Sequence, residues 1–183
     1  INLSNYQETT GIQDPIKVYE YMNLFYVEEG NKRVSVMKYF DAVSIPGYVT
    51  RLLPPKSKDT ETKIYYEFLD FYEKTKINYI WFSKEGSFKK LLKLVGKKKD
   101  DIWTADDCMN FESVFMRFKR EYERKNSDLS ITAGDAFLTF VELHGYEHLL
   151  QLSSDEINAL TLGTKEEFNL LDKEEDIKLL LSP

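Results

Sequence analysis

The sequence predicts an α+β protein, with a small sheet and one helix in residues 1–58 and an all-helical unit in residues 59–183. Three observations support this division. Short apolar and aromatic runs bounded by turn residues dominate the first part. A polar, proline-led segment, Pro54–Asp59, follows as a linker. Beyond it, apolar residues recur at helical spacing and capping residues separate one run from the next. We therefore expect two domains.

Three segments of the first part are expected to be strands. Proline lacks an N–H and is tolerated where a strand begins, so Asp14-Pro15 is typical of a turn before a short strand at residues 16–19. The apolar run Leu24–Glu28 predicts the second strand, and Gly47–Leu53 predicts the third. The apolar residues between these last two runs have helical spacing: Val34, Met37, Phe40 and Ala42.

A turn at Gly30 joins the second expected strand directly to this helix. Such a turn leaves backbone N–H groups free at the helix N-terminus, which is an anion-binding arrangement. Lys32 and Arg33 lie in the first helical turn, where the helix dipole favours acids instead. We expect a negative group to compensate these cations, either the neighbouring Glu28 and Glu29 or a bound phosphate.

Capping signals divide the second part into helices. The strongest apolar stripe follows Thr104, at spacings of three and four residues: Cys108, Phe111, Phe115, Phe118 and Tyr122. Residues 77–82 form an apolar run that predicts either a strand or a buried helical turn. The expected caps are Asp59, Ser87 (before residues 88–95), Thr104 with Asp107, Thr132 with Asp135, Ser153 with Glu156, and Thr164 with Glu167.

Composition limits the class of protein. The net charge of −6 argues against an unspecialised DNA-coating protein, since such proteins are usually basic. The single cysteine, Cys108, excludes an internal disulfide and fits a reducing compartment, so a cytoplasmic location is expected. No stretch approaches the roughly 20 apolar residues of a membrane span. Because the chain starts at Ile1, we expect it to be part of a longer protein.

A lysine cluster is the second candidate for contact with a polyanion. Residues 84–99 hold seven lysines against one acid, Glu85. Lys89, Lys93 and Lys97 follow one another at four-residue intervals, so one helix face is expected to be basic. The alternative is an ordinary solvated face balanced by the acidic C-terminal part. Arg51, on the third strand, is a further candidate for nucleic-acid contact.

No metal site is predicted from histidines. His144 and His148 have the spacing of a helical metal pair, but Gly145 is expected to break the helix between them, and no third ligand is apparent.

The order of motifs in residues 14–53 resembles the ParB/sulfiredoxin superfamily. The motifs are Pro15-Ile16-Lys17-Val18, then an aromatic strand, then Glu29-Gly30-Asn31-Lys32-Arg33 opening a helix, then Ile45-Pro46-Gly47-Tyr48-Val49. The resemblance implies a small mixed sheet with a helix and a turn that holds phosphate of a nucleotide or of nucleic acid. It implies that Gly30 permits close approach, that Lys32 and Arg33 pair with phosphate oxygens, and that Asn31 donates a hydrogen bond.

The expected function is therefore a ParB-like module that binds DNA or a nucleotide, with a regulatory role of the bacterial transcriptional-regulator type. Asn31 stands where the sulfiredoxin-type members have their reactive cysteine, so sulfinic-acid reduction is excluded. A phosphate-handling enzyme, kinase-like or nuclease-like, is the first alternative; Glu28 or Glu29 would then be the general base, and Mg²⁺ with a nucleotide would be the cofactor. The second alternative is a protein-interaction module with a vestigial turn, in which the helical half docks a partner; self-association into a homo-oligomer would point to this alternative.

Overall fold

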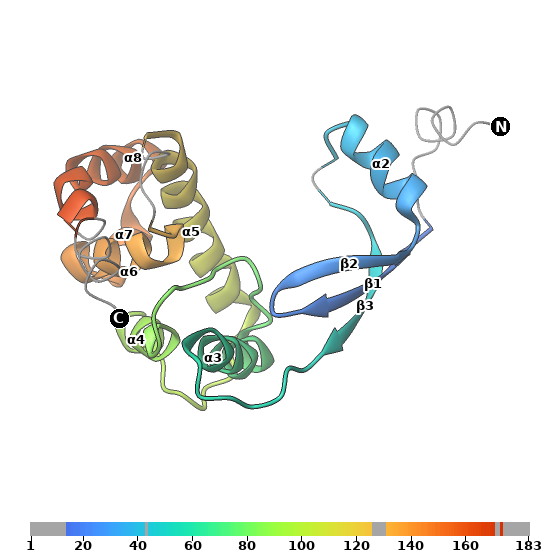
Figure 1. Ribbon diagram of the computed structural model, residues 1–183. Coiled ribbons are helices and arrows are strands. Elements are labelled where there is room, and N and C mark those ends of the chain that lie inside the picture. Colours follow the sequence, from blue (N-terminus) through green and yellow to red (C-terminus); the bar gives the residue numbers. More distant parts are fainter. Residues whose placement is uncertain (1–13, 43, 126–130, 171–172, 174–183) are drawn as a thin grey trace. The chain divides into compact units, whose positions relative to one another are not determined.

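The computed structural model describes residues 14–42, 44–125, 131–170 and 173 (Figure 1). Two compact units divide the chain, Ile1–Ser57 and Lys58–Pro183. We call them the sheet unit and the helical unit and describe each by itself.

The sheet unit is a three-stranded mixed sheet with one helix (Figure 1). Its elements are β1 (Ile16–Tyr21), β2 (Leu24–Glu29), α2 (Asn31–Tyr39) and β3 (Gly47–Leu52). The strand order is β2-β1-β3, with β1 antiparallel to β2 and parallel to β3. The expected mixed sheet with its helix is confirmed.

One face of β1 holds the small core of this unit. Ile16, Val18 and Glu20 are buried, whereas Lys17 and Tyr21 on the opposite face are exposed, which is the alternation of a half-buried strand. Met37 of α2 is the buried residue of that helix. A tight turn through Met22 and Asn23, both with positive φ, returns the chain into β2.

Helices are the regular elements of the helical unit among the residues that the structure describes, so the all-helical expectation is confirmed. Its helices are α3 (Thr60–Thr75), α4 (Ser87–Leu94), α5 (Ala105–Lys125), α6 (Ala133–His144), α7 (Tyr146–Gln151) and α8 (Ser154–Gly163), and residues 165–170 are also helical. Residues 77–82 are neither strand nor helix. They form an irregular buried segment that contributes Ile77, Ile80 and Phe82 to the core.

Aromatic rings fill the core of the helical unit. The stripe expected on α5 is buried, and its rings meet those of α6: the centroids of Phe118 and Phe140 lie 4.8 Å apart, and those of Phe115 and Phe137 lie 5.1 Å apart. Offset and edge-to-face contacts of this kind stabilise a core beyond simple burial. Cys108, at the end of the stripe, is partly buried and donates from Sγ to the Thr75 carbonyl.

Most of the expected helix caps are present. Asp59 accepts from the Thr62 N–H, Thr132 accepts from the Asp135 N–H, and Thr104 with Asp107 bond each other's N–H groups. Ser153 and Glu156 form the full reciprocal box at α8. The capping residues in the sequence therefore predicted the first residues of these four helices correctly.

Two expected caps are wrong. The N-cap of α4 is Gly86, so Ser87 is the first helical residue and its side chain caps nothing. Thr164 does not form the expected box with Glu167, because its hydroxyl bonds back to the Leu160 carbonyl and lies 3.1 Å from His144 Nε2.

Candidate functional site

The turn between β2 and α2 needs glycine for two reasons. Gly30 has φ of 106°, which side-chain-bearing residues rarely adopt. A Cβ added to Gly30 would also lie 2.5 Å from Ile16 Cγ2, far inside van der Waals contact. The turn is therefore pressed against the start of β1, and α2 begins at the very next residue.

The N-terminus of α2 has no side-chain cap and no acid in its first turn. The first helical hydrogen bond runs from the Val34 N–H to the Gly30 carbonyl. The backbone N–H groups of Asn31, Lys32 and Arg33 form no hydrogen bond with any described residue. Asn31 and Lys32 are exposed. These free donors and the positive end of the helix dipole favour an anion here.

The Arg33 side chain binds neighbouring groups of the sheet unit. Its Nη1 donates to the carbonyl oxygens of Asp14 (3.2 Å) and Pro15 (3.0 Å), and its Nη2 lies 3.7 Å from Glu29 Oε1. The side chain is 18% exposed. Arg33 thus ties the first turn of α2 to the segment that leads into β1. The two carbonyl oxygens and the Glu29 carboxylate balance the charge of the guanidinium. Lys32 is therefore the exposed cation of the turn.

Glu28 and Glu29 bond to β1 instead of capping α2. Glu28 accepts from the Tyr19 hydroxyl at 2.9 Å, and Glu29 pairs with Lys17 at 2.8 Å. The hydrogen bond with Lys17 lowers the pKa of Glu29, and the same bond raises the pKa of Lys17. Because the two carboxylates have different partners on β1, the arrangement offers no shared carboxylate site for a divalent cation.

Arg51 lies away from the turn. It pairs with Glu20, which is 1% exposed, and the two residues are direct neighbours in the β1–β3 register. Glu20 is four residues along β1 from Ile16, the residue against which Gly30 packs, a separation of about 13 Å along the strand. Arg51 therefore neutralises a buried carboxylate and does not join Lys32 and Asn31.

The lysine cluster does not form the continuous basic face expected from its spacing. Lys89 and Lys93 are exposed on α4 and have no ionic partner among the described residues. Lys97 lies beyond the end of α4 and pairs with Asp107 of α5 at 2.7 Å. That pairing and the Thr104 N–H lower the pKa of Asp107. Lys97 therefore forms an ion pair within the helical unit. Of the three lysines expected on one face, Lys89 and Lys93 remain exposed on α4.

Sequence reasoning missed Lys17 and Tyr19, which hold the two glutamates. Folding the chain back at Met22-Asn23 places Tyr19 opposite Tyr26, but the same register would place Lys17 opposite Glu28. The pairing of Lys17 with Glu29 results from a register shift between Lys17 and Val18, which the turn alone does not predict.

The described residues contain no group of three or more His, Cys, Asp or Glu side chains that could hold a metal ion. Comparison of the chain with protein-family models, curated proteins and solved structures gave no match in any of the three. Within the same described ranges, no helix has both the length and the apolar character needed to cross a bilayer.

Proposed function

We propose that this chain contains a ParB-like module that binds a phosphate of DNA or of a nucleotide at the Gly30–Arg33 turn and serves a regulatory role in the cytoplasm. The observation that carries the proposal is the uncapped N-terminus of α2. The backbone N–H groups of Asn31, Lys32 and Arg33 have no hydrogen-bond partner among the described residues, Lys32 is exposed, and the first turn of α2 holds no acid. Together these features favour a negatively charged group.

The residues of the turn take different roles in this proposal. Lys32 supplies the point charge, and the exposed Asn31 supplies an amide donor. Arg33 is a positioning residue, because its guanidinium holds the carbonyls of Asp14 and Pro15. Gly30 allows the tight turn, because its positive φ and its close approach to Ile16 leave no room for a side chain.

A mobility-shift titration of the full chain with duplex DNA, at two salt concentrations, tests the proposal. Binding through backbone phosphates falls steeply as salt rises. Lys32→Ala should weaken binding. It should also lower the slope of log K against log salt concentration by about one, the value expected for the loss of one phosphate contact. Lys38→Ala is the matched control, because Lys38 is an exposed lysine in the last turn of the same helix. Equal losses in the two variants would remove the turn from the mechanism.

A nucleotide ligand calls for a separate measurement. Thermal-shift assays with a panel of nucleotides, with and without Mg²⁺, detect a ligand that binds only the folded form, since at a hundred times its Kd it adds about 2.7 kcal/mol. Turnover in the same mixtures would favour the phosphate-handling enzyme. That alternative has less support, because both candidate bases, Glu28 and Glu29, are engaged by β1.

One observation favours the protein-interaction alternative. Large apolar side chains of the sheet unit are exposed, among them Leu24 (59%), Tyr26 (53%) and Tyr48 (69%). Exposed apolar groups at this density often mark interaction surfaces. Concentration-dependent self-association in light scattering, together with no response to any nucleotide or DNA, would support this function over phosphate binding.

A further inference from the structure

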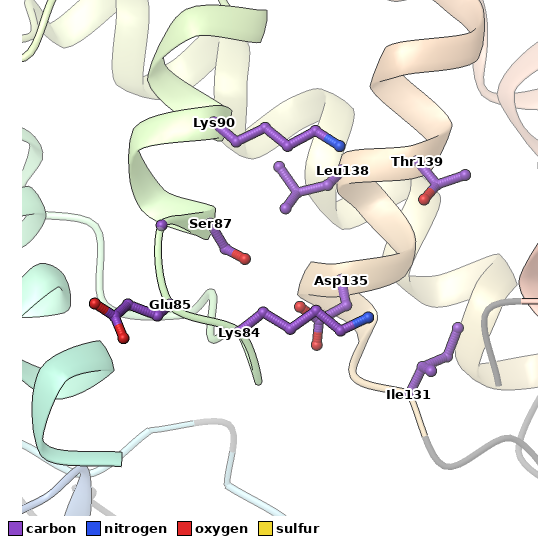
Figure 2. A pocket seen from close by; sticks show the side chains of 9 residues that line it. Lys84, Glu85, Ser87, Lys90, Ile131, Asp135, Leu138 and Thr139 are labelled. Carbon is purple, nitrogen blue, oxygen red and sulfur yellow. The ribbon is translucent and has the colours of Figure 1, made fainter. Parts of the chain in front are cut away.

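The charged side chains around the cavity between α4 and α6 have partners within the chain (Figure 2). The cavity has a volume of about 290 Å³. On its border Glu85 lies 3.0 Å from Lys63, and Lys90 lies 2.8 Å from Glu142. Asp135 accepts hydrogen bonds from a backbone N–H and from a nearby threonine hydroxyl. Because the chain itself balances these groups, the open surface of the sheet unit is the stronger candidate for binding a partner.

One face of the three-stranded sheet carries Lys17, Tyr19 and Tyr21 of β1, whereas Ile16 and Val18 lie on the other face. Side chains at opposite positions of neighbouring strands share a face. The register therefore assigns three rows of residues to the first face, each crossing from β2 through β1 to β3. The rows are Glu29, Lys17 and Tyr48; Tyr26, Tyr19 and Thr50; and Leu24, Tyr21 and Leu52. We call this surface the tyrosine face.

The tyrosine face is apolar where the outer face of a sheet is normally polar. A sheet with one covered face typically alternates apolar residues toward the core with polar residues toward water. Here the core-facing residues of β1 are buried, yet large aromatic and aliphatic side chains dominate the outer face as well. The exposed fractions range from 39% to 69% for Tyr21, Leu24, Tyr26, Tyr48 and Leu52. A contiguous set of this kind marks an interaction surface.

The area of the tyrosine face fits a second copy of the chain. A large side chain has roughly 200 Å² of surface, so the five exposed residues together present roughly 500 Å². Tyr19, Thr50 and backbone atoms add to this area. Two such faces in contact would bury at least about 1,000 Å², the lower limit for a specific protein interface. Tyrosine suits such a contact, because its ring is apolar while its hydroxyl can still bind a partner group or water.

The charges at the border of the tyrosine face disfavour a polyanion as its partner. Exposed aromatic side chains can also stack on the bases of single-stranded nucleic acid. However, Lys17 pairs with Glu29 at 2.8 Å, and Glu28 accepts from the Tyr19 hydroxyl. One cation and two carboxylates leave this border with a net negative charge, which repels phosphates. A protein partner is therefore favoured over nucleic acid and over an anionic membrane surface.

We propose that two copies of this chain associate through their tyrosine faces as a symmetric dimer. A two-fold axis parallel to the strands places the row of Leu24, Tyr21 and Leu52 on the same row of the second copy, so apolar side chains meet apolar side chains. The middle rows meet in the same way. The row that contains Lys17 and Glu29 stays at the rim of the interface, where its charges remain hydrated.

The α2 turn lies against the other face of the sheet. Gly30 packs on the Ile16 side chain, which belongs to the face opposite the tyrosines. The dimer therefore does not depend on phosphate binding at the turn, and either property can exist without the other.

Sedimentation equilibrium of the full chain, from low to high micromolar concentration, tests the dimer. We expect the average mass to rise from that of one chain to that of two and no further. Tyr48→Ser should raise the dimer Kd at least tenfold, because it removes a large side chain from the contact. Val49→Ser is the matched control, since Val49 is 52% exposed on the same strand but belongs to the opposite face. It should change the Kd less than about threefold.

A second matched pair of variants lies on β2. Tyr26→Ser should weaken the dimer, whereas Phe25→Ser should not, because Phe25 is 57% exposed but belongs to the opposite face. Hydrogen exchange of the β1 amides at the lowest concentration, where the chain is monomeric, shows whether each variant is folded.

The same measurement separates the dimer from phosphate binding. Lys32→Ala should leave the dimer Kd unchanged, whatever its effect on DNA binding. The mass of one chain at every concentration, a mass that exceeds two chains, or equal losses within each matched pair would overturn the proposal. Saturable binding of single-stranded DNA to a chain that stays monomeric, abolished by Tyr48→Ser, would also overturn it and would assign the tyrosine face to nucleic acid.

Discussion

In the helical unit the largest aromatic side chains are almost completely shielded from solvent, whereas in the sheet unit the buried apolar residues that the structure describes are Ile16, Val18 and Met37. The sheet unit instead relies on specific polar and backbone contacts, such as the Glu20–Arg51 pair and the close approach of Gly30 to Ile16. The contrast teaches that a unit with a thin apolar core depends on a few residues whose chemistry is hard to replace.

Removing one aromatic ring from the core of the helical unit should cause the largest loss of unfolding free energy, and the loss should be confined to that unit. Phe118→Ala deletes a fully buried ring that contacts Phe137, Phe140 and Phe168, and we expect a loss of about 4 kcal/mol in unfolding free energy. Both tryptophans, Trp81 and Trp103, lie in this unit, so urea unfolding followed by their fluorescence reports on it. Met109→Ala, on the exposed side of α5, should change stability by less than about 0.5 kcal/mol.

The sheet unit should be most sensitive at its buried ion pair. Glu20→Ala leaves Arg51 without its carboxylate and the Asn23 N–H without its acceptor, so we expect a loss of about 3 kcal/mol. Because the tryptophans are elsewhere, hydrogen exchange of the β1 amides is the suitable measurement. The double variant Glu20→Ala/Arg51→Ala should be less destabilised than the sum of the single variants. Strict additivity would mean that the pair contributes nothing as a pair.

Alanine substitutions at two glycines, Gly30 and Gly86, distinguish the free-energy cost of a steric clash from the cost of a positive φ. Gly30 has a positive φ, and in Gly30→Ala the new Cβ would also lie 2.5 Å from Ile16 Cγ2. We therefore expect the sheet unit to lose about 2–3 kcal/mol of unfolding free energy. Gly86→Ala has a positive φ but no neighbouring atom within 4 Å, so about 1 kcal/mol is expected in the helical unit. Similar losses at both positions, each measured by hydrogen exchange, would show that packing against Ile16 is unimportant.

The smallest effect concerns pH in the helical unit. Lys97 and the Thr104 N–H lower the pKa of Asp107 below its usual 3.8. A carboxyl whose pKa is lower in the folded state stabilises the fold above its unfolded pKa, and this contribution disappears as pH falls through the folded pKa. Asp107→Asn should therefore cost about 1 kcal/mol or less at pH 7 and less than that at pH 2, in urea unfolding. A constant difference across that range would contradict the ionic origin.

The fold class followed from the sequence because local signals determine it. The alternation of Ile16 and Val18 with Lys17, the stripe of phenylalanines on α5 and the capping pair Ser153–Glu156 depend on neighbours within a few positions. The cap expected at Ser87 was wrong because Gly86, with positive φ, ends the preceding loop one residue earlier. The Thr164 box was wrong because its hydroxyl bonds backward to Leu160.

The candidate site was only partly predictable, because its decisive contacts join distant residues. The tight turn at Gly30 and the free start of the next helix could be foreseen from the strand-to-helix pattern. The engagement of Arg33 depends on carbonyls 18 and 19 residues away, and that of Arg51 on Glu20, 31 residues away. Periodicity carries no information about such pairs, so a guanidinium committed to the fold looks like a free ligand in the sequence.

The position of β1 in the middle of the sheet has a consequence for synthesis on the ribosome. Its first neighbour, β2, follows at once, but its parallel neighbour β3 begins with Gly47, the partner of Ile16, 31 residues further along. At translation rates of about 5–20 residues per second, one border of β1 stays without its hydrogen-bonding partner for about 2–6 seconds. The nascent hairpin must remain soluble during that interval, and the charged Lys17 and Glu29 at its open end suit that requirement.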